Sequence, residues 1–218
     1  MSQIVIAIDG PAASGKGTVS KAISKKLHFN YLDTGKLYRT IGAKYLEGYQ
    51  PIAAAQSLER NDLDKYNLQK PEIAKAASEI ASIPEVRAAL LEFQRNFSQK
   101  LPGAVLDGRD IGSVIFLDAG IKFFVTADLV VRAKRRKEQY KKIGQEYSIK
   151  DIAKKLEERD RRDKIRKASP LICMPDAIVY DNSKGSFKRL NKEIIEIVEK
   201  KYKSLELKVI NKRLGHTS

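Results

Sequence analysis

Residues 4–23 read IVIAIDGPAASGKGTVSKAI, and this stretch decides the fold of the chain. It begins with an apolar run over residues 4–8, passes through a glycine-bounded turn, and continues as a helical pattern from about Lys16. The turn, residues 10–18, fits the pattern G-x-x-x-x-G-K, with Gly17 and then Thr18 where the stricter pattern has Ser or Thr directly after the lysine. A strand, such a turn and a helix together predict a phosphate-binding loop.

This loop has the chemistry to hold a chain of phosphate groups. Backbone N–H groups that point into the loop, at the positive end of a helix, match the charge and the acceptor oxygens of phosphate. Lys16 adds a compact cation for the β and γ oxygens, and the Thr18 hydroxyl can donate a hydrogen bond to a phosphate. A chance glycine-rich turn is the alternative, and it is disfavoured because the strand and the helix both stand where the pattern requires them.

Four further β-like runs follow, separated by helical or irregular segments. This order is typical of a parallel sheet with crossover helices. Each run ends near a polar stretch, and in open α/β sheets the ligand lies at the carboxyl ends of the strands. We therefore predict a three-layer α/β fold, a five-stranded parallel sheet flanked by helices. The five runs are residues 4–8, 29–32, 104–106, 121–125 and 177–180.

The composition fits 218 residues in one domain, or in one core with smaller appended parts. Hydrophobic residues make up 42%, which suffices for a packed core, and no apolar run approaches the ~20 residues of a membrane span. The N-terminus runs straight into the first strand, so we expect no signal peptide. The single cysteine, Cys173, suits a reducing cytoplasm. A net charge of +15 predicts an acidic partner, either a nucleic acid or a phosphorylated small molecule.

Two segments look appended to the core. Residues 36–100 are mostly helical in pattern, and Pro84 should end a helix at or before Ile83. Residues 144–170 are highly charged, and Ser148 followed by Asp151 predicts a capped helix start.

One face of this charged helix begins as an apolar stripe and ends in arginines. Arginines on one face repel one another unless an anion lies between them. A solvated helix, neutralised by its own acidic residues, is the alternative. The phosphate loop in the same chain favours a lid whose arginines stabilise phosphate oxygens. The face consists of Ile149, Ile152, Leu156, Arg159, Arg162, Asp163 and Arg166.

Two polar turns indicate a second ligand. YLDTGKLYR brings Asp33, Thr34 and Arg39 to the end of the second strand, and VLDGRDIGS brings Arg109 and Asp110 to the end of the third. An arginine flanked by carboxylates can be a structural ion pair. Two such turns beside a phosphate loop favour a charged ligand instead, with an arginine on its phosphate and a carboxylate on a hydroxyl or amino group.

Several segments together resemble one known family. The chain resembles the bacterial cytidylate kinases from Ile4 to about Ser183. The DGRD-x-G and ERD-x-RD-x-x-R segments are far more specific than the phosphate loop alone. The matching segments read IDGPAASGKGT, YLDTGKLYR, AASEIASIPEVRAALLEFQRNF, PGAVLDGRDIGSVIFLDAGIKFFVTA, RAKRR and ERDRRDKIRKASPL.

This resemblance implies the fold of the P-loop nucleoside monophosphate kinases and the reaction of ATP with CMP or dCMP, giving ADP and CDP or dCDP. Mg²⁺ would be held mainly by nucleotide phosphates and water, with Thr18 as a candidate ligand. We expect a cytoplasmic monomer with no membrane or nucleic-acid partner. The P-loop core would comprise residues 1–35, 101–143 and 171–218, the NMP-binding region residues 36–100, and the lid residues 144–170.

The resemblance also implies roles for individual residues. The ATP phosphates would contact Gly10, Pro11, Ala12, Ala13, Ser14, Gly15, Lys16, Gly17 and Thr18, with Arg132 and Arg136 on the ATP side. CMP would contact Asp33, Thr34, Arg39, Ser78, Arg87, Arg109, Asp110, Arg159, Asp163 and Arg166. Among these, Ser78, Arg87 and Asp110 would read the cytosine. Lys16, Arg159 and Arg162 would stabilise the transferred phosphoryl group.

The chain departs from the family pattern in three places. Ala12 and Ala13 stand where many members have Ser and Gly, and Thr34 stands where Ser is common. The family usually has a small β-sheet insert in its NMP-binding region. Residues 50–72 show no strand alternation, so we expect a shortened insert that covers the pyrimidine less.

Two other functions are compatible with parts of the sequence. Another P-loop small-molecule kinase, acting on UMP, AMP or shikimate, would share the phosphate loop but not the lid and DGRD segments. A basic protein that binds nucleic acid would account for the charge. Against it stand an aromatic content of only 7%, no tryptophan, and no recognised nucleic-acid module.

Overall fold

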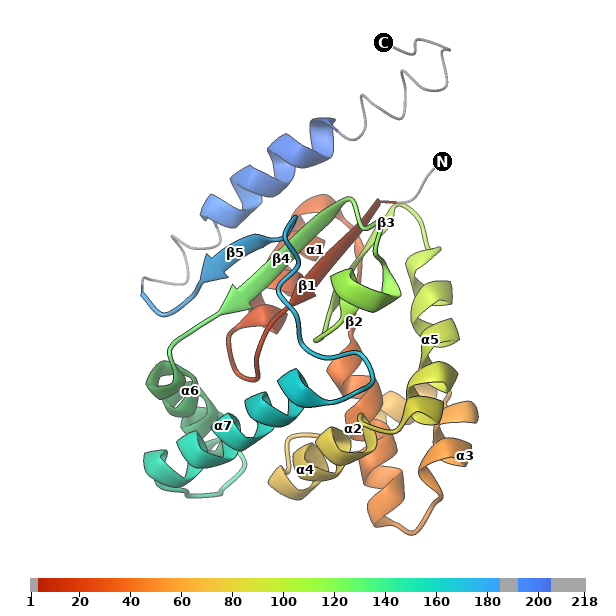
Figure 1. Ribbon diagram of the computed structural model, residues 1–218, viewed down its shortest axis with the longest axis vertical. Coiled ribbons are helices and arrows are strands. Elements are labelled where there is room, and N and C mark those ends of the chain that lie inside the picture. Colours follow the sequence, from red (N-terminus) through yellow and green to blue (C-terminus); the bar gives the residue numbers. More distant parts are fainter. Residues whose placement is uncertain (1–3, 185–191, 205–218) are drawn as a thin grey trace.

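The computed structural model describes residues 4–184 and 192–204 (Figure 1). Its five strands are β1 (Ile4–Asp9), β2 (Asn30–Asp33), β3 (Gly103–Asp107), β4 (Ile121–Thr126) and β5 (Ile178–Asp181). The helices are α1 (Lys16–Leu27), α2 (Thr34–Leu46), α3 (Pro51–Gln56), α4 (Pro71–Ile80), α5 (Pro84–Ser98), α6 (Leu129–Lys141) and α7 (Ile149–Ile165), with a 3-10 turn η1 (Arg60–Asp64) and a short π-helix η2 (Ile111–Ile115). Residues 192–204 are also helical.

The strands form one parallel sheet in the order β2-β3-β1-β4-β5. All five predicted strands are confirmed. Because β1 lies at the centre, the phosphate loop that follows it emerges in the middle of the carboxyl edge. The polar turns after β2 and β3 emerge on one side of it, and α6 follows β4 on the other.

Side chains alternate across β1 and divide the core into two layers. Val5 and Ala7 pack with residues of α2 and α5, whereas Ile6 and Ile8 pack with α1 and the helix over residues 192–204. Ile6 and Ile8 are fully buried, which contributes about 2–3 kcal/mol each to folding. Helices therefore cover both faces of the sheet, and the three-layer prediction is confirmed.

The two appended segments are helical. Residues 36–100 contain no strand, and α3 and η1 occupy the place of the expected insert. Pro84 begins α5, as its fixed φ favours at the first helical position. The Ser148 hydroxyl accepts a hydrogen bond from Asp151 N at 3.0 Å, so the predicted cap of α7 is confirmed.

One expectation for this helix is wrong, and part of the predicted core is not described. Ile149 does not join the apolar stripe, because as the first residue of α7 it lies on the solvent side and is 36% exposed. The cluster under α7 contains Ile152 and Leu156 instead. Residues 1–3, 185–191 and 205–218 of the predicted core lie outside the described residues. None of the helices that are described has the length and apolar character needed to span a bilayer.

Candidate active site

The phosphate loop closes around the ammonium group of Lys16. Lys16 Nζ donates to Gly10 O and to Pro11 O, both at 2.8 Å, and the side chain is only 6% exposed. Gly10 and Gly15 have φ of 143° and 98°, in the region that glycine adopts without strain. A Cβ at Gly10 would lie 2.0 Å from Val125 O, so the loop needs glycine there for space as well.

The charge on Lys16 is poorly compensated. Burial, followed by the nearby Arg109 guanidinium, lowers the pKa of Lys16 to about 7, although Asp107 and Asp9 act in the opposite direction. Burial also raises the pKa values of Asp9 and Asp107 to about 6. An anion with several charges would remove this cost by supplying the missing countercharge.

More cations converge on the same place from other elements. Burial and the neighbouring Arg109 lower the pKa of Arg159 to about 9, although Asp163 acts in the opposite direction, and Arg136 and Arg39 add to the lowering. Among the described residues, no hydrogen-bond partner reaches Arg159 Nε, and no ion pair includes its guanidinium. These arginines come from α2, the turn after β3, α6 and α7. The sheet edge therefore carries a surplus of positive charge beside the phosphate loop.

Two of these arginines are tied to carboxylates. Arg39 Nη2 donates to Asp33 Oδ2 at 2.7 Å, and Arg109 Nε donates to Asp163 Oδ2 at 2.8 Å. The Asp33 carboxylate also caps α2 by accepting from Lys36 N. Such pairs hold guanidinium groups in place while leaving their other N–H donors available, because guanidinium has five donors. Arg39 and Arg109, both predicted to contact CMP, are thus held in fixed positions.

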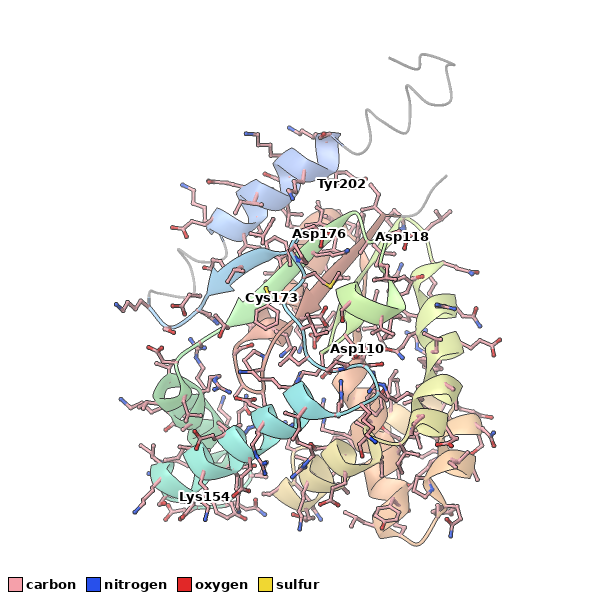
Figure 2. The ribbon with its side chains drawn as sticks, viewed as in Figure 1. Asp110, Asp118, Lys154, Cys173, Asp176 and Tyr202 are labelled. Carbon is pink, nitrogen blue, oxygen red and sulfur yellow. The ribbon has the colours of Figure 1, made fainter. Side chains whose placement is uncertain are left out.

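A second group lies between α4, α5, α7 and the turn after β3. Arg87 Nη2 is bonded to the Asp110 carboxylate, and Arg166 lies 4.0 Å from the other Asp110 oxygen. Figure 2 shows Asp110 beside the C-terminal end of α7. Arg162 Nη1 donates to Ser78 Oγ at 2.9 Å. The residues expected to read the base are therefore brought together, and Arg162, expected at the phosphoryl group, contacts one of them.

A cavity of about 210 Å³ lies beside this group. Tyr38, Arg87 and Asp110 line it together with apolar residues of α5 and η2. The Arg87 guanidinium lies 5.5 Å from the centre of the Tyr38 ring. Burial raises the pKa of Tyr38 to about 12. A neutral aromatic ring and a carboxylate–guanidinium pair beside a small cavity suit a planar ligand with hydrogen-bonding edges.

The remaining predicted residues contact the protein itself. Thr34 Oγ1 donates to Asp107 O at 2.7 Å, at the junction of the two acceptor turns. The Arg136 guanidinium lies over the Tyr140 ring at 5.8 Å. The Arg132 guanidinium is bound by Ala127 O, Ala12 O and Asp160, so it reaches the phosphate loop through the backbone of Ala12.

The sequence reasoning missed several buried supports. The Asp9 carboxylate accepts from Ile111 N and Gly112 N, both at 2.8 Å, and joins the start of the phosphate loop to the turn that carries Asp110. Arg135 Nη1 and Asn182 Nδ2 both donate to Ser14 O. The only signal for Asp9 was its place directly before Gly10.

Comparisons with known proteins agree with this geometry. The family model for cytidylate kinase matches residues 6–60 and 48–200. A cytidylate kinase of Cereibacter sphaeroides is 47% identical over 197 residues, which cover 90% of this chain and 96% of that protein. One of Rhodospirillum rubrum is 45% identical over 192 residues, covering 83% and 90%.

Among solved structures, an uncharacterized protein of Eubacterium ventriosum superimposes with a TM-score of 0.54 at 14% identity, covering 90% of this chain and 99% of that one. This likeness concerns the fold alone. The family model and the relatives extend over the phosphate loop, both acceptor turns and α7, the elements that converge at the sheet edge. The chain belongs to the cytidylate kinase family.

Proposed function

We propose that this protein transfers the γ-phosphate of ATP to CMP or dCMP, giving ADP and CDP or dCDP. The observation that carries the proposal is the group of buried and partly buried cations between the phosphate loop and the Arg87–Asp110 pair. Two phosphorylated ligands that meet there would neutralise it. The cavity beside Arg87 and Asp110 suits the base of the acceptor.

In this proposal the phosphate loop holds ATP and the two acceptor turns hold CMP. Backbone N–H groups between Ala13 and Gly17 donate to the ATP phosphates, and Lys16 contacts the β and γ oxygens. Arg39 and Arg109 bind the acceptor phosphate. Asp110 accepts from the cytosine amino group, and Arg87 donates to the ring acceptors. The proposal includes a core of residues 1–35, 101–143 and 171–218, an NMP-binding region of residues 36–100 and a lid of residues 144–170.

No general base is needed for this reaction. The acceptor phosphate has a second pKa of about 6, so at pH 7 it is largely a dianion and already nucleophilic. The work of the protein is to align the two phosphates, exclude water and stabilise the charge on the oxygens of the transferred group. Lys16 and Arg159 are the cations best placed for the last task.

The residues near the loop fit a Mg²⁺ ion that arrives with ATP. In the described ranges no cluster of three or more metal-ligating side chains exists. Oxygen donors near the loop include the Thr18 hydroxyl and the Asp107 carboxylate, whose Oδ2 would lie 3.6 Å from a Cβ at Gly17. Mg²⁺ prefers a site with few protein ligands, where phosphate oxygens and water supply most of its coordination. The ion would neutralise charge on the phosphates, and Thr18 and Asp107 would orient its water shell.

A coupled assay for ADP release tests the proposal. Mg-ATP is offered with CMP, dCMP, UMP, AMP or shikimate separately, and Lys16→Ala serves as the inactive control. We expect strong turnover with CMP and dCMP, little with the others, and a loss of at least about 100-fold in Lys16→Ala. Turnover that favours AMP or shikimate, or none with any acceptor, would contradict the proposal.

A further inference from the structure

The helix α7 is bonded directly to the phosphate loop at Ala12. Asp160 Oδ1 accepts from Ala12 N at 3.4 Å, and Asp160 Oδ2 accepts from Arg132 Nη1. Arg132 Nη1 also donates to Ala12 O at 3.3 Å, while Arg132 Nε donates to Ala127 O at 2.9 Å. Both backbone polar groups of Ala12 are therefore occupied by side chains of α6 and α7. We call Asp160, Arg132 and Ala12 the latch.

The latch is buried and packed. Asp160, Arg132 and Ala12 are 8%, 7% and 2% exposed, so water competes little for their hydrogen bonds. Ala12 also joins an apolar cluster with Ile152 and Leu156 of α7. Removing one partner from a buried ion pair leaves the other charged and unpaired, which is strongly unfavourable. The contacts of Ala12 thus fix the position of the α7 turn that carries Asp160 relative to the phosphate loop.

The latch lies next to Arg159, a cation of the site that has no ion pair among the described residues. Arg159 precedes Asp160 in α7, and its guanidinium has no ion-pair partner in the part of the chain that is described. Consecutive residues of a helix point about 100° apart, so Asp160 can face the loop while Arg159 faces the phosphates. Fixing Asp160 against Ala12 therefore fixes the backbone that carries Arg159.

We infer that Asp160 and Arg132 are positioning residues that hold Arg159 at its working distance from the phosphate loop. The inference requires neither side chain to touch a nucleotide, because the hydrogen bonds that they make at the loop are to the backbone of Ala12. The inference rests on the proposed phosphoryl transfer. It assigns Arg132 to the loop backbone rather than to ATP.

A kinetic cycle with Arg159 tests this inference. Displacing a catalytic group by about 1 Å can cost on the order of 100-fold in rate. We expect Asp160→Asn to lower kcat between about 10-fold and 100-fold in the otherwise unchanged protein. In an Arg159→Met background the same substitution should lower kcat by less than about 3-fold, because the group that Asp160 positions is gone. A purely structural role would give the same factor in both backgrounds.

The controls separate this inference from folding and from the proposed function. Glu157→Gln changes an exposed carboxylate of the same helix and should leave kcat unchanged. If Asp160→Asn does not fold, as judged by thermal unfolding, Arg132→Lys replaces it, because lysine keeps the charge but its single nitrogen cannot take the places of both Nε and Nη1. Equal factors in both backgrounds, or an unchanged kcat in Asp160→Asn, would overturn the inference. An unmutated protein without CMP turnover would instead refute the proposed function.

Discussion

Replacing Arg159 by methionine should stabilise the nucleotide-free protein while abolishing most of its activity. Burial and Arg109 lower the pKa of Arg159 from 12.5 to about 9, so its charge is unfavourable in the folded state. At about 1.4 kcal/mol per pKa unit, the upper bound on this cost is about 5 kcal/mol. The side chain is only partly buried, and solvent screening reduces the expected gain to about 1–2 kcal/mol. Methionine keeps much of the apolar stem and removes the charge.

Thermal unfolding in a buffer free of phosphate and sulfate measures the first half of this prediction. For a domain of this size, about 1–2 kcal/mol corresponds to a rise in Tm of roughly 2–8 °C. The coupled assay measures the second half, a fall in kcat of about 1,000-fold or more. ATP should raise the Tm of the unchanged protein more than that of the variant, because ligand stabilisation follows affinity. Arg161→Met, at an exposed position of α7, is the control and should alter neither quantity. A lower Tm for nucleotide-free Arg159→Met would refute the reasoning, because it would make Arg159 a structural residue.

Three further predictions follow from the site. At pH 8 about nine-tenths of Lys16 is neutral in the free protein if its pKa is about 7, and bound phosphates raise that pKa. Calorimetry in two buffers of different ionisation enthalpy should therefore show that the protein takes up a proton when it binds ATP, and Lys16→Ala should show no such uptake. The affinity for ATP should fall by about tenfold from pH 6 to pH 8. Asp110→Asn should reduce the CMP-to-UMP ratio of kcat/KM by at least about tenfold, because an amide can donate to the uracil oxygen; an unchanged ratio would show that Asp110 does not read the base. Asp9→Asn should lower the free energy of unfolding by about 1–3 kcal/mol in denaturant titration, since one buried N–H loses its acceptor; no change would mean that water replaces the lost bond.

Much of the fold could be predicted because its signals are local. The apolar runs that became the five strands, the glycines of the phosphate loop, Pro84 and the Ser148 cap all act within a few residues of where they stand. Ile149 shows the limit of such reasoning. Periodicity placed it on the apolar face, but at the first position of α7 no neighbouring element covers it.

The missed residues depend on contacts that periodicity cannot reveal. Asp9 binds residues more than 100 positions away in the chain, and Asp160 binds Ala12 across 148 positions. An isolated aspartate in a sequence carries no mark of its distant partner. The helical period of α7 predicts that its arginines lie on one face. Only the fold shows that Asp160 pairs with Arg132 at the phosphate loop, while Arg159 has no ion pair among the described residues.

The shortened insert, residues 50–72, affects the surface that covers the nucleotide and not the residues expected to read the base. Residues 50–72 form only α3 and η1, and in the described structure they contribute none of the residues expected to read the base. Ser78, Arg87 and Asp110 lie outside this segment: Arg87 pairs directly with Asp110, and Arg162 of α7 donates to Ser78. Discrimination between cytosine and uracil depends on the donor and acceptor pattern at Asp110 and Arg87, which the shortening leaves intact. A larger insert would cover more of the bound nucleotide and would therefore raise the affinity for CMP and dCMP. We therefore expect the shortened region to raise KM for CMP and dCMP while the preference for cytosine is retained.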